Sequence, residues 1–192
     1  MGERGVRAAI SSTSAEVVKK IARWLTGNIE NRRRGLLLYG DKGLGKTTLC
    51  YAIVRLVELC KASVAEFCRR NRSKLTPADE QEEWLWLRTQ TPVIVTAKEL
   101  TQASEKRLEE LSREGVLIID DIGVEPVEIN IFGTQTTPII DIINKRYAKQ
   151  RCTIITTNLD EDGIAARYGD RTEDRLREMC DKIAFSGESY RR

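Results

Sequence analysis

The chain has 192 residues, of which 41% are hydrophobic and 32% are charged, and its formal net charge is +3. This size and composition are typical of a globular protein with one substantial core. The absence of histidine excludes a His-based catalytic triad and a His-ligated zinc site, and no apolar run approaches the roughly 18 residues of a membrane span.

The cysteines and the N-terminus indicate a cytoplasmic protein. Five cysteines show no C-x-x-C spacing and fall mostly among apolar neighbours, as expected for reduced thiols used as small hydrophobic residues. Residues 1–12 lack the apolar core of a signal peptide and are predicted to be flexible. Basic runs at 32–34 and 69–74 are suited to nucleic-acid phosphates or to a solvated surface, and the sequence leaves both open.

The first predicted helix follows the flexible N-terminus. Thr13 and Glu16 fit a capping box, the apolar face continues to Leu25, and Gly27 ends the helix. A basic linker at 28–34 comes next.

Apolar runs typical of buried strands then alternate with helical patterns. The predicted strands are 36–39, 92–97, 116–119, 152–156 and 183–185. The predicted helices are 46–61, an exposed helix over about 98–113, one that begins at Pro138, one over about 161–167, and one that Thr172 caps. A loop is expected at 123–137, and 62–90 are unclear apart from a helix start at Thr76-Pro77. This alternation predicts an α/β fold with a mostly parallel five-stranded sheet between two helical layers.

A phosphate-binding loop lies between the first strand and the next helix. Gly40, Gly45, Lys46 and Thr47 satisfy the P-loop pattern G-x-x-x-x-G-K-[ST]. Glycines let backbone N–H groups turn toward phosphate oxygens, and the helix start adds its positive dipole end. We expect Lys46 to reach the β- and γ-phosphates of ATP and the Thr47 hydroxyl to ligate Mg²⁺. The residues predicted to bind nucleotide here are Gly40, Asp41, Lys42, Gly43, Leu44, Gly45, Lys46, Thr47 and Thr48.

Two carboxylates follow the apolar run 116–119. Asp120 and Asp121 form a Walker B pattern, and ligands of α/β sheets bind at this end of the strands. We expect Asp120 to hold Mg²⁺ through its water shell and Asp121 to orient the attacking water. A pair of solvated acids is the alternative, which the upstream P-loop disfavours.

Two further patterns concern the γ-phosphate. The next strand ends in Thr156-Thr157-Asn158, where a polar side chain is expected beside Asp121 to help position water, although asparagine also favours strand-end turns. Residues 167–177 contain four arginines among acidic residues. These arginines suit either a γ-phosphate contact across a subunit interface or surface ion pairing, and their spacing alone favours ion pairing.

In this order the motifs resemble the AAA+ ATPases of the bacterial DnaC/IstB group, which are replicative helicase loaders and transposition helper ATPases. The resemblance rests on residues 40–48, 116–123, 156–158, the box Gly169-Asp170-Arg171-Thr172-Glu173-Asp174-Arg175-Leu176 and the closing Ser189-Tyr190-Arg191. It implies a P-loop NTPase fold without a separate lid domain, one ATPase domain over 13–192, and hydrolysis of ATP with Mg²⁺.

The resemblance also implies roles for individual residues. Asn158 matches sensor 1, Arg175 matches the arginine finger with Arg171 as second candidate, and Arg191 matches the sensor 2 arginine that contacts nucleotide in its own subunit. An arginine finger implies self-assembly into a ring or spiral in which each subunit completes its neighbour's site. The implied partners are a DnaB-type helicase or a transposase, and single-stranded DNA along the inner face of the assembly.

The favoured interpretation is an ATP-dependent DNA replication protein, similar to helicase loaders, that acts on single-stranded DNA. A transposition helper is the alternative within the family. A P-loop small-molecule kinase leaves Asn158 and 169–176 unexplained. A nucleotide-binding module with little hydrolysis is also open, because Asp121 stands where AAA+ proteins usually have glutamate.

Overall fold

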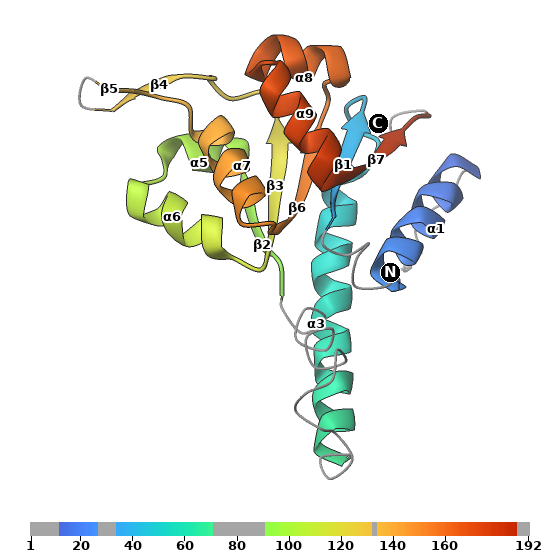
Figure 1. Ribbon diagram of the computed structural model, residues 1–192. Coiled ribbons are helices and arrows are strands. Elements are labelled where there is room, and N and C mark those ends of the chain that lie inside the picture. Colours follow the sequence, from blue (N-terminus) through green and yellow to red (C-terminus); the bar gives the residue numbers. More distant parts are fainter. Residues whose placement is uncertain (1–11, 27–33, 71–90, 132–133, 188–192) are drawn as a thin grey trace, which may run out of the picture.

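The computed structural model describes residues 12–26, 34–70, 91–131 and 134–187. Its main sheet has five parallel strands in the order β2-β3-β6-β1-β7 (Figure 1). These strands are β1 (Gly35–Gly40), β2 (Val93–Thr96), β3 (Val116–Ile122), β6 (Cys152–Thr157) and β7 (Cys180–Phe185). The predicted α/β fold and five-stranded sheet are confirmed. No helix within the described ranges is long and apolar enough to cross a membrane.

Helices cover both faces of this sheet, as the alternation of the sequence predicts. The helices are α1 (Ser12–Thr26), α3 (Lys46–Arg70), α5 (Ala97–Gln102), α6 (Glu105–Arg113), α7 (Pro138–Ala148), α8 (Glu161–Tyr168) and α9 (Asp170–Met179). In one apolar cluster, helices α5, α6, α7, α8 and α9 pack against the face of the sheet that carries Leu37, Ile119 and Ile155. A second joins α1 and α3 with the face that carries Leu38 and Ile118. Neighbouring strand residues point to opposite faces, so a sheet covered on both sides requires uninterrupted apolar strands.

Two helices near the start of the chain differ from their predicted bounds. α1 begins one residue before Thr13, which therefore lies inside the helix rather than capping it. α3 does not end near Lys61 but continues to Arg70, because the sequence after Lys61 keeps good helix formers and has no glycine or proline. The predicted helix start at Thr76-Pro77 lies outside the described residues.

α5 and α6 replace the single helix predicted over 98–113. Ser104 separates them, and its side chain accepts a hydrogen bond from the backbone N–H of Arg107, which starts α6. Leu100 and Leu111 are fully buried. The prediction of one continuous exposed helix is therefore wrong, because a cap interrupts it and each half contributes to the core.

A small hairpin lies where a loop was predicted over 123–137. β4 (Ile129–Ile131) and β5 (Thr134–Thr136) pair antiparallel and extend away from the main sheet (Figure 1). Each strand has three residues, which is too short for an alternating pattern to stand out in the sequence. The last strand, β7, also begins three residues earlier than 183, at Cys180.

The start of α9 corrects another prediction. Gly169 occupies the N-cap position with φ +86°, and the helix begins at Asp170. Thr172 lies inside the helix, where its hydroxyl donates to the carbonyl oxygen of Tyr168 at 2.9 Å. Thr172 therefore caps nothing, because the chain turns from α8 to α9 through the glycine.

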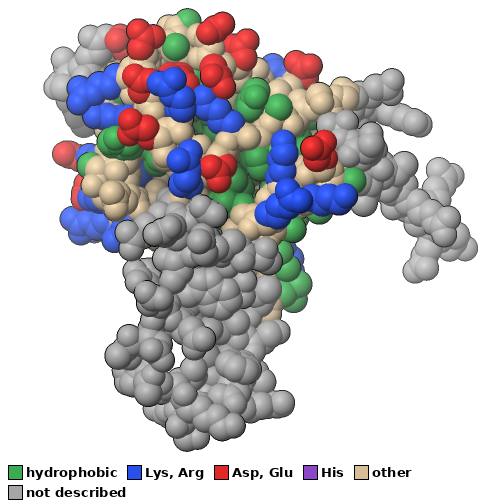
Figure 2. Space-filling model, turned by 45° about the vertical axis from the view of Figure 1, so that its right-hand side comes forward, with side chains coloured by type: hydrophobic (Ala, Val, Ile, Leu, Met, Phe, Trp, Pro, Cys, Tyr) green, Lys and Arg blue, Asp and Glu red, His purple; other side chains and the backbone are tan. Residues whose placement is uncertain are grey.

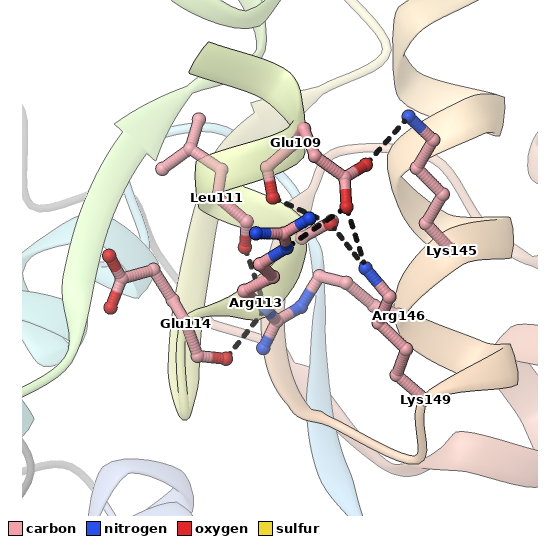
Figure 3. Close-up of polar contacts among 8 residues, drawn as sticks. Glu109, Leu111, Arg113, Glu114, Lys145, Arg146 and Lys149 are labelled. Atoms are coloured by element: carbon pink, nitrogen blue, oxygen red, sulfur yellow. Dashed lines mark hydrogen bonds and ion pairs between the residues drawn. The ribbon is translucent and has the colours of Figure 1, made fainter. Parts of the chain in front are cut away.

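α7 has the predicted start and the predicted buried face, and it is joined to α6 by ion pairs. Its inward residues are Ile139, Ile142, Ile143 and Arg146. Glu109 of α6 contacts Lys145 at 3.2 Å, Lys149 at 3.1 Å and Arg113 at 3.1 Å (Figure 3). Hydrogen bonds from Lys149 and Lys145 lower the pKa of Glu109 to about 2.

Arg146 of α7 forms buried hydrogen bonds next to these ion pairs. Its Nη1 donates to the carbonyl oxygens of Leu111 at 2.8 Å and Glu114 at 2.9 Å, and its Nη2 donates to that of Cys152 at 2.6 Å. Nε donates to Thr153 Oγ1 at 2.9 Å. Burial lowers the pKa of Arg146 to about 10, so the guanidinium stays charged at neutral pH. This arginine links α6, α7 and β6.

Candidate nucleotide-binding site

The C-terminal ends of β1, β3 and β6 lie side by side, because these three strands are neighbours in the sheet. Their arrowheads point to one edge in Figure 1. β1 leads into the loop 41–45, β3 carries Asp120 and Asp121, and Asn158 follows β6. The topology therefore gathers the P-loop and the polar strand ends at one edge.

The P-loop has the backbone conformation that its glycines permit. Gly40, Gly43 and Gly45 have φ values of +133°, +82° and +87°. A Cβ on Gly40 would lie 2.1 Å from the carbonyl oxygen of Phe185, whereas a Cβ on Gly45 would meet nothing within 4 Å. Gly40 is thus required by close approach to β7, and Gly45 by its left-handed conformation. α3 starts directly after it, so the helix N-terminus faces the loop.

Lys46 connects this loop to the end of β6. Its side chain is 7% exposed, and Nζ donates to the carbonyl oxygens of Gly40 at 2.5 Å and Asp41 at 2.8 Å. The same Nζ donates to Asn158 Oδ1 at 2.9 Å. Among the other predicted loop residues, the exposed ones are Asp41, Lys42, Thr47 and Thr48, and Leu44 is buried. The structure thus brings together Lys46 and Asn158, which are far apart in the sequence.

Thr47 and Asp120, the residues predicted to hold Mg²⁺, are in direct contact. Thr47 Oγ1 donates to Asp120 Oδ1 at 3.0 Å. Hydroxyl and carboxylate oxygens are ligands that Mg²⁺ prefers. Backbone N–H groups and the Lys46 ammonium are suitable donors to phosphate oxygens. The residues at this edge therefore fit Mg²⁺–ATP. Burial and the nearby Asp120 charge raise the pKa of the Cys50 thiol to about 12.

β3 is irregular where it carries the two carboxylates. Its register with β6 shifts between Ile119 and Ile122, so Asp120 and Asp121 together stand opposite Thr156. Asp121 has φ +60°, a left-handed conformation that aspartate tolerates better than most residues. A regular strand points consecutive side chains to opposite faces, and this bulge changes that direction. The side chains of Asp120 and Asp121 can therefore both face the C-terminal edge of the sheet.

Two side chains from the end of β6 hold the carboxylates. Asn158 Nδ2 donates to Asp121 Oδ1 at 3.0 Å. Thr156 Oγ1 donates to Asp120 Oδ1 at 2.6 Å and accepts from the backbone N–H of Asp121 at 2.7 Å. Sequence reasoning expected a polar side chain of residues 156–158 beside Asp121, and Asn158 takes that place, but the two contacts of Thr156 with Asp120 and the Asp121 backbone were not foreseen. A threonine near the end of a buried strand was the available signal, and its partners depend on the bulge.

Glu125 is a second residue that sequence reasoning missed. It is 2% exposed, and Oε2 accepts from the backbone N–H groups of Gly123 at 2.9 Å and Val124 at 3.1 Å. Tyr168 donates its hydroxyl to Oε1, and Arg167 donates to the backbone oxygen of Glu125. Burial, together with the Glu125 carboxylate, raises the pKa of Tyr168. These contacts tie the loop after β3 to the end of α8, and a glutamate in a polar loop gives no sequence signal for them.

The predicted trans-acting arginines lie elsewhere. Arg175 of α9 donates to Asn144 Oδ1 and lies over the ring of Tyr147 at 5.2 Å, both on α7. Arg171 is exposed in the first turn of α9. Within the described part of the chain, neither is hydrogen-bonded to the polar groups at the end of the sheet. Arg191 lies outside the described residues. The roles of all the site residues stay predictions.

One residue of the basic run 32–34 has a structural contact. Arg34 Nε pairs with Asp181 at 2.8 Å, and its Nη2 donates to the carbonyl oxygens of Arg177 at 3.1 Å and Cys180 at 3.2 Å. Acidic and basic side chains are interspersed on the face drawn in Figure 2. Arg34 thus pairs with β7 and the end of α9, and for the basic runs as a whole nucleic-acid contact and a solvated surface both stay open.

Comparisons with known proteins agree with this fold. The family model described as IstB-like ATP binding protein matches residues 94–192, and that of the ATPase family associated with various cellular activities (AAA) matches residues 36–125. No curated protein matches the sequence.

Solved structures share the fold at low sequence identity. A crystal structure of DnaI is 19% identical with a TM-score of 0.63, covering 97% of this chain and 88% of that chain. A crystal structure of the DnaC helicase loader is 19% identical with a TM-score of 0.57, covering 92% of each chain. AMPPCP-bound DnaA from Aquifex aeolicus is 15% identical with a TM-score of 0.55, covering 93% of this chain and 48% of that chain.

Proposed function

The chain belongs to the family of IstB-like ATP-binding proteins, and we propose that it is a Mg²⁺-dependent ATPase that acts as a switch on single-stranded DNA. The observation that carries the ATPase proposal is the sheet-end cluster, which comprises Lys46, Thr47, Asp120, Asp121 and Asn158. Hydrogen bonds of 2.9–3.0 Å join Lys46 to Asn158, Asn158 to Asp121, and Thr47 to Asp120. Lys46, which can bind phosphate, therefore lies at the same edge of the sheet as the other groups. These are the oxygen atoms of Thr47 and Asp120, which can bind a metal, and the Asp121 carboxylate, which can orient water.

Phosphate binding uses the P-loop and Lys46. Backbone N–H groups of the loop and the N-terminus of α3 bind the phosphate oxygens. Lys46 exchanges the neutral carbonyl oxygens of Gly40 and Asp41 for phosphate oxygens, which are stronger acceptors because they are charged. Thr47 and Asp120 hold Mg²⁺, which when bound neutralises charge on the β- and γ-phosphates.

Hydrolysis uses Asp121 and Asn158. The water oxygen forms a bond to the γ-phosphorus while the bond from this phosphorus to the β–γ bridging oxygen breaks, and ADP leaves with that electron pair. The water proton passes to Asp121 and from there to solvent. Asn158 contacts both Asp121 and Lys46, so it orients the base and the cation about the γ-phosphate.

The switch follows from nucleotide-dependent assembly. In this proposal residues 13–192 act as one ATPase domain, Arg191 contacts nucleotide in its own subunit, and Arg175 or Arg171 completes a neighbour's site. To reach a neighbour, Arg175 must first leave Asn144. Nucleotide shifts the population toward the assembled form only if that form binds it more tightly. The likeness in fold to the DnaC helicase loader supports a DnaB-type helicase as partner, and membership of the IstB-like family keeps a transposase as the alternative.

Phosphate release tests the ATPase proposal. We expect Mg²⁺-dependent release of phosphate from ATP, stimulated by single-stranded DNA, and a loss of about 100-fold or more in Lys46→Ala because the phosphate cation is gone. Lys106→Ala, at an exposed position of α6, is the control and should retain most activity. Nucleotide binding without any phosphate release would instead support a non-hydrolysing module, and transfer to a small acceptor by a monomer would support a kinase.

Subunit mixing tests whether sites form in trans. Arg175→Ala and Asp121→Asn subunits are each expected to be impaired, and mixing them should restore some ATPase because one interface regains both groups. The same mixture with Arg171→Ala identifies the finger. No restoration with either arginine variant at any ratio would contradict a site shared between subunits. Capture of a hexameric helicase or of a transposase by the full chain then decides the partner.

A further inference from the structure

We infer that Thr156 is a positioning residue for hydrolysis, whose hydroxyl presents both Walker B carboxylates to Mg²⁺ and to the attacking water. The inference rests on the proposed function and adds a residue to its site. Thr156 is 1% exposed, and its Oγ1 is bonded to Asp120 on one side and to Asp121 on the other.

The hydroxyl of Thr156 has a fixed hydrogen-bond direction. A hydroxyl has one proton to donate, and here it goes to Asp120 Oδ1 at 2.6 Å. Its lone pair accepts the backbone N–H of Asp121 at 2.7 Å. Because an N–H can only donate, it forces the hydroxyl proton toward the carboxylate. The Thr156 proton therefore points at Asp120 Oδ1 and fixes the orientation of this carboxylate.

The same hydroxyl also stabilises the bulge in β3. Two residues stand opposite Thr156 there, and the ladder hydrogen bonds are interrupted between Ile119 and Ile122. The Thr156 oxygen takes the place of a ladder acceptor for the N–H of Asp121. It holds Asp121 at φ +60°, in the conformation from which its side chain meets Asn158 at 3.0 Å.

Thr47 and Thr156 hold one oxygen of Asp120 between them. Thr47 Oγ1 is 3.0 Å and Thr156 Oγ1 is 2.6 Å from Oδ1. Among the described residues, both of these hydrogen bonds reach Oδ1 and none reaches the second oxygen of this carboxylate. Partners of this kind orient a metal ligand, and their loss typically lowers metal affinity or activity about 10–100-fold.

The chain offers a conservative variant and a matched control. Thr156→Ser keeps the hydroxyl, whereas Thr156→Val keeps the shape and removes it. Thr157→Val removes a neighbouring buried hydroxyl, which donates to the carbonyl oxygen of Ile122 at 2.8 Å and accepts from the N–H of Leu159 at 3.1 Å. Thr157 bonds only to backbone in these contacts, so it controls for the loss of any buried hydroxyl in β6.

The experiment measures two quantities in the full chain. One is the Mg²⁺ concentration for half-maximal binding of a fluorescent ATP analogue, and the other is kcat and KM for phosphate release. In Thr156→Val we expect the half-saturating Mg²⁺ concentration to rise and kcat to fall, each about 10-fold or more, with KM for ATP changed less than about threefold. Thr156→Ser should recover most of both, and Thr157→Val should lower Tm without moving the Mg²⁺ dependence.

Several results would overturn the inference. Unchanged Mg²⁺ dependence and kcat in Thr156→Val would do so, and so would an equal loss in Thr156→Ser or in Thr157→Val. If Thr156→Val does not fold, Thr156→Ala is measured in the same way. If the unsubstituted chain binds the analogue but releases no phosphate, hydrolysis fails while the Mg²⁺ curves still decide the role of Thr156. If it binds no nucleotide, the proposed function and this inference fail together.

Discussion

Two polar clusters lie against the same sheet, and they use their charges differently. The sheet-end cluster leaves Lys46 bonded to backbone carbonyl oxygens that a phosphate can replace. The α6–α7 network, which comprises Glu109, Arg113, Lys145, Arg146 and Lys149, directs the Arg146 donors to oxygens fixed in the fold. The first cluster has groups that can change partner, whereas the second joins α6, α7 and β6. Charged residues therefore indicate function only where the fold leaves them an exchangeable contact.

The largest effect on stability is expected at the buried centre of the α6–α7 network. Arg146→Met leaves the carbonyl oxygens of Leu111 and Cys152 and the hydroxyl of Thr153 without their buried donor. Each loss costs about 1–3 kcal/mol, so the free energy of unfolding should fall by about 3 kcal/mol or more in urea denaturation. Lys145→Met, at the exposed edge of the network, should lose at most about 1 kcal/mol. Equal stability of the two variants would contradict the structural role of Arg146.

A smaller effect is expected where the loop after β3 meets α8. Tyr168→Phe removes the donor to the buried Glu125 carboxylate and should lower the free energy of unfolding by about 1–3 kcal/mol. Tyr147→Phe is the control, because its hydroxyl donates to the exposed Glu178 and its loss should cost clearly less stability. Thermal unfolding of both variants sharpens the comparison, and a larger loss in the control would show that the Glu125 contact contributes little.

The smallest effect concerns acid. The pKa of Glu109 is lowered in the folded state to about 2 from its ordinary value of about 4.5, so its ion pairs stabilise the fold above the unfolded pKa. This contribution is lost as the pH falls from about 4.5 through about 2, because the carboxylate becomes protonated. Glu109→Gln should therefore flatten the decline of the urea midpoint across this window. An unchanged slope would show that solvent already screens these pairs.

Local patterns in the sequence predicted the fold and most of the cluster. Continuous apolar runs located β1, β3 and β6, and the spacing of Gly40, Gly45 and Lys46 located the P-loop between a strand and a helix. These features depend on residues near one another in the chain. The carboxylate pair after Ile119 followed from the rule that ligands bind at strand ends.

Features that depend on register or on distant partners were not predictable. The contacts of Thr156 depend on the bulge in β3, and those of the Glu125 side chain depend on the packing of α8 against the loop after β3. Neither the bulge nor this packing can be read from the spacing of residues in the sequence. Thr172 is a residue type that often caps a helix, yet the N-cap of α9 is Gly169, about one helical turn earlier. The helix break at Ser104 was not predicted, because this serine lies in a highly charged segment and the pattern of charges says little about where a helix ends.

The most direct test of the central claim compares wild type with Asp121→Asn for Mg²⁺-dependent phosphate release, with nucleotide affinity measured on the same samples. Asparagine keeps the size of the side chain and removes the base. The account predicts steady phosphate release by the wild type, and in the variant a fall in kcat of about 100-fold or more with nucleotide affinity changed less than about threefold. Release at the wild-type rate by Asp121→Asn, or none by the wild type, would contradict it.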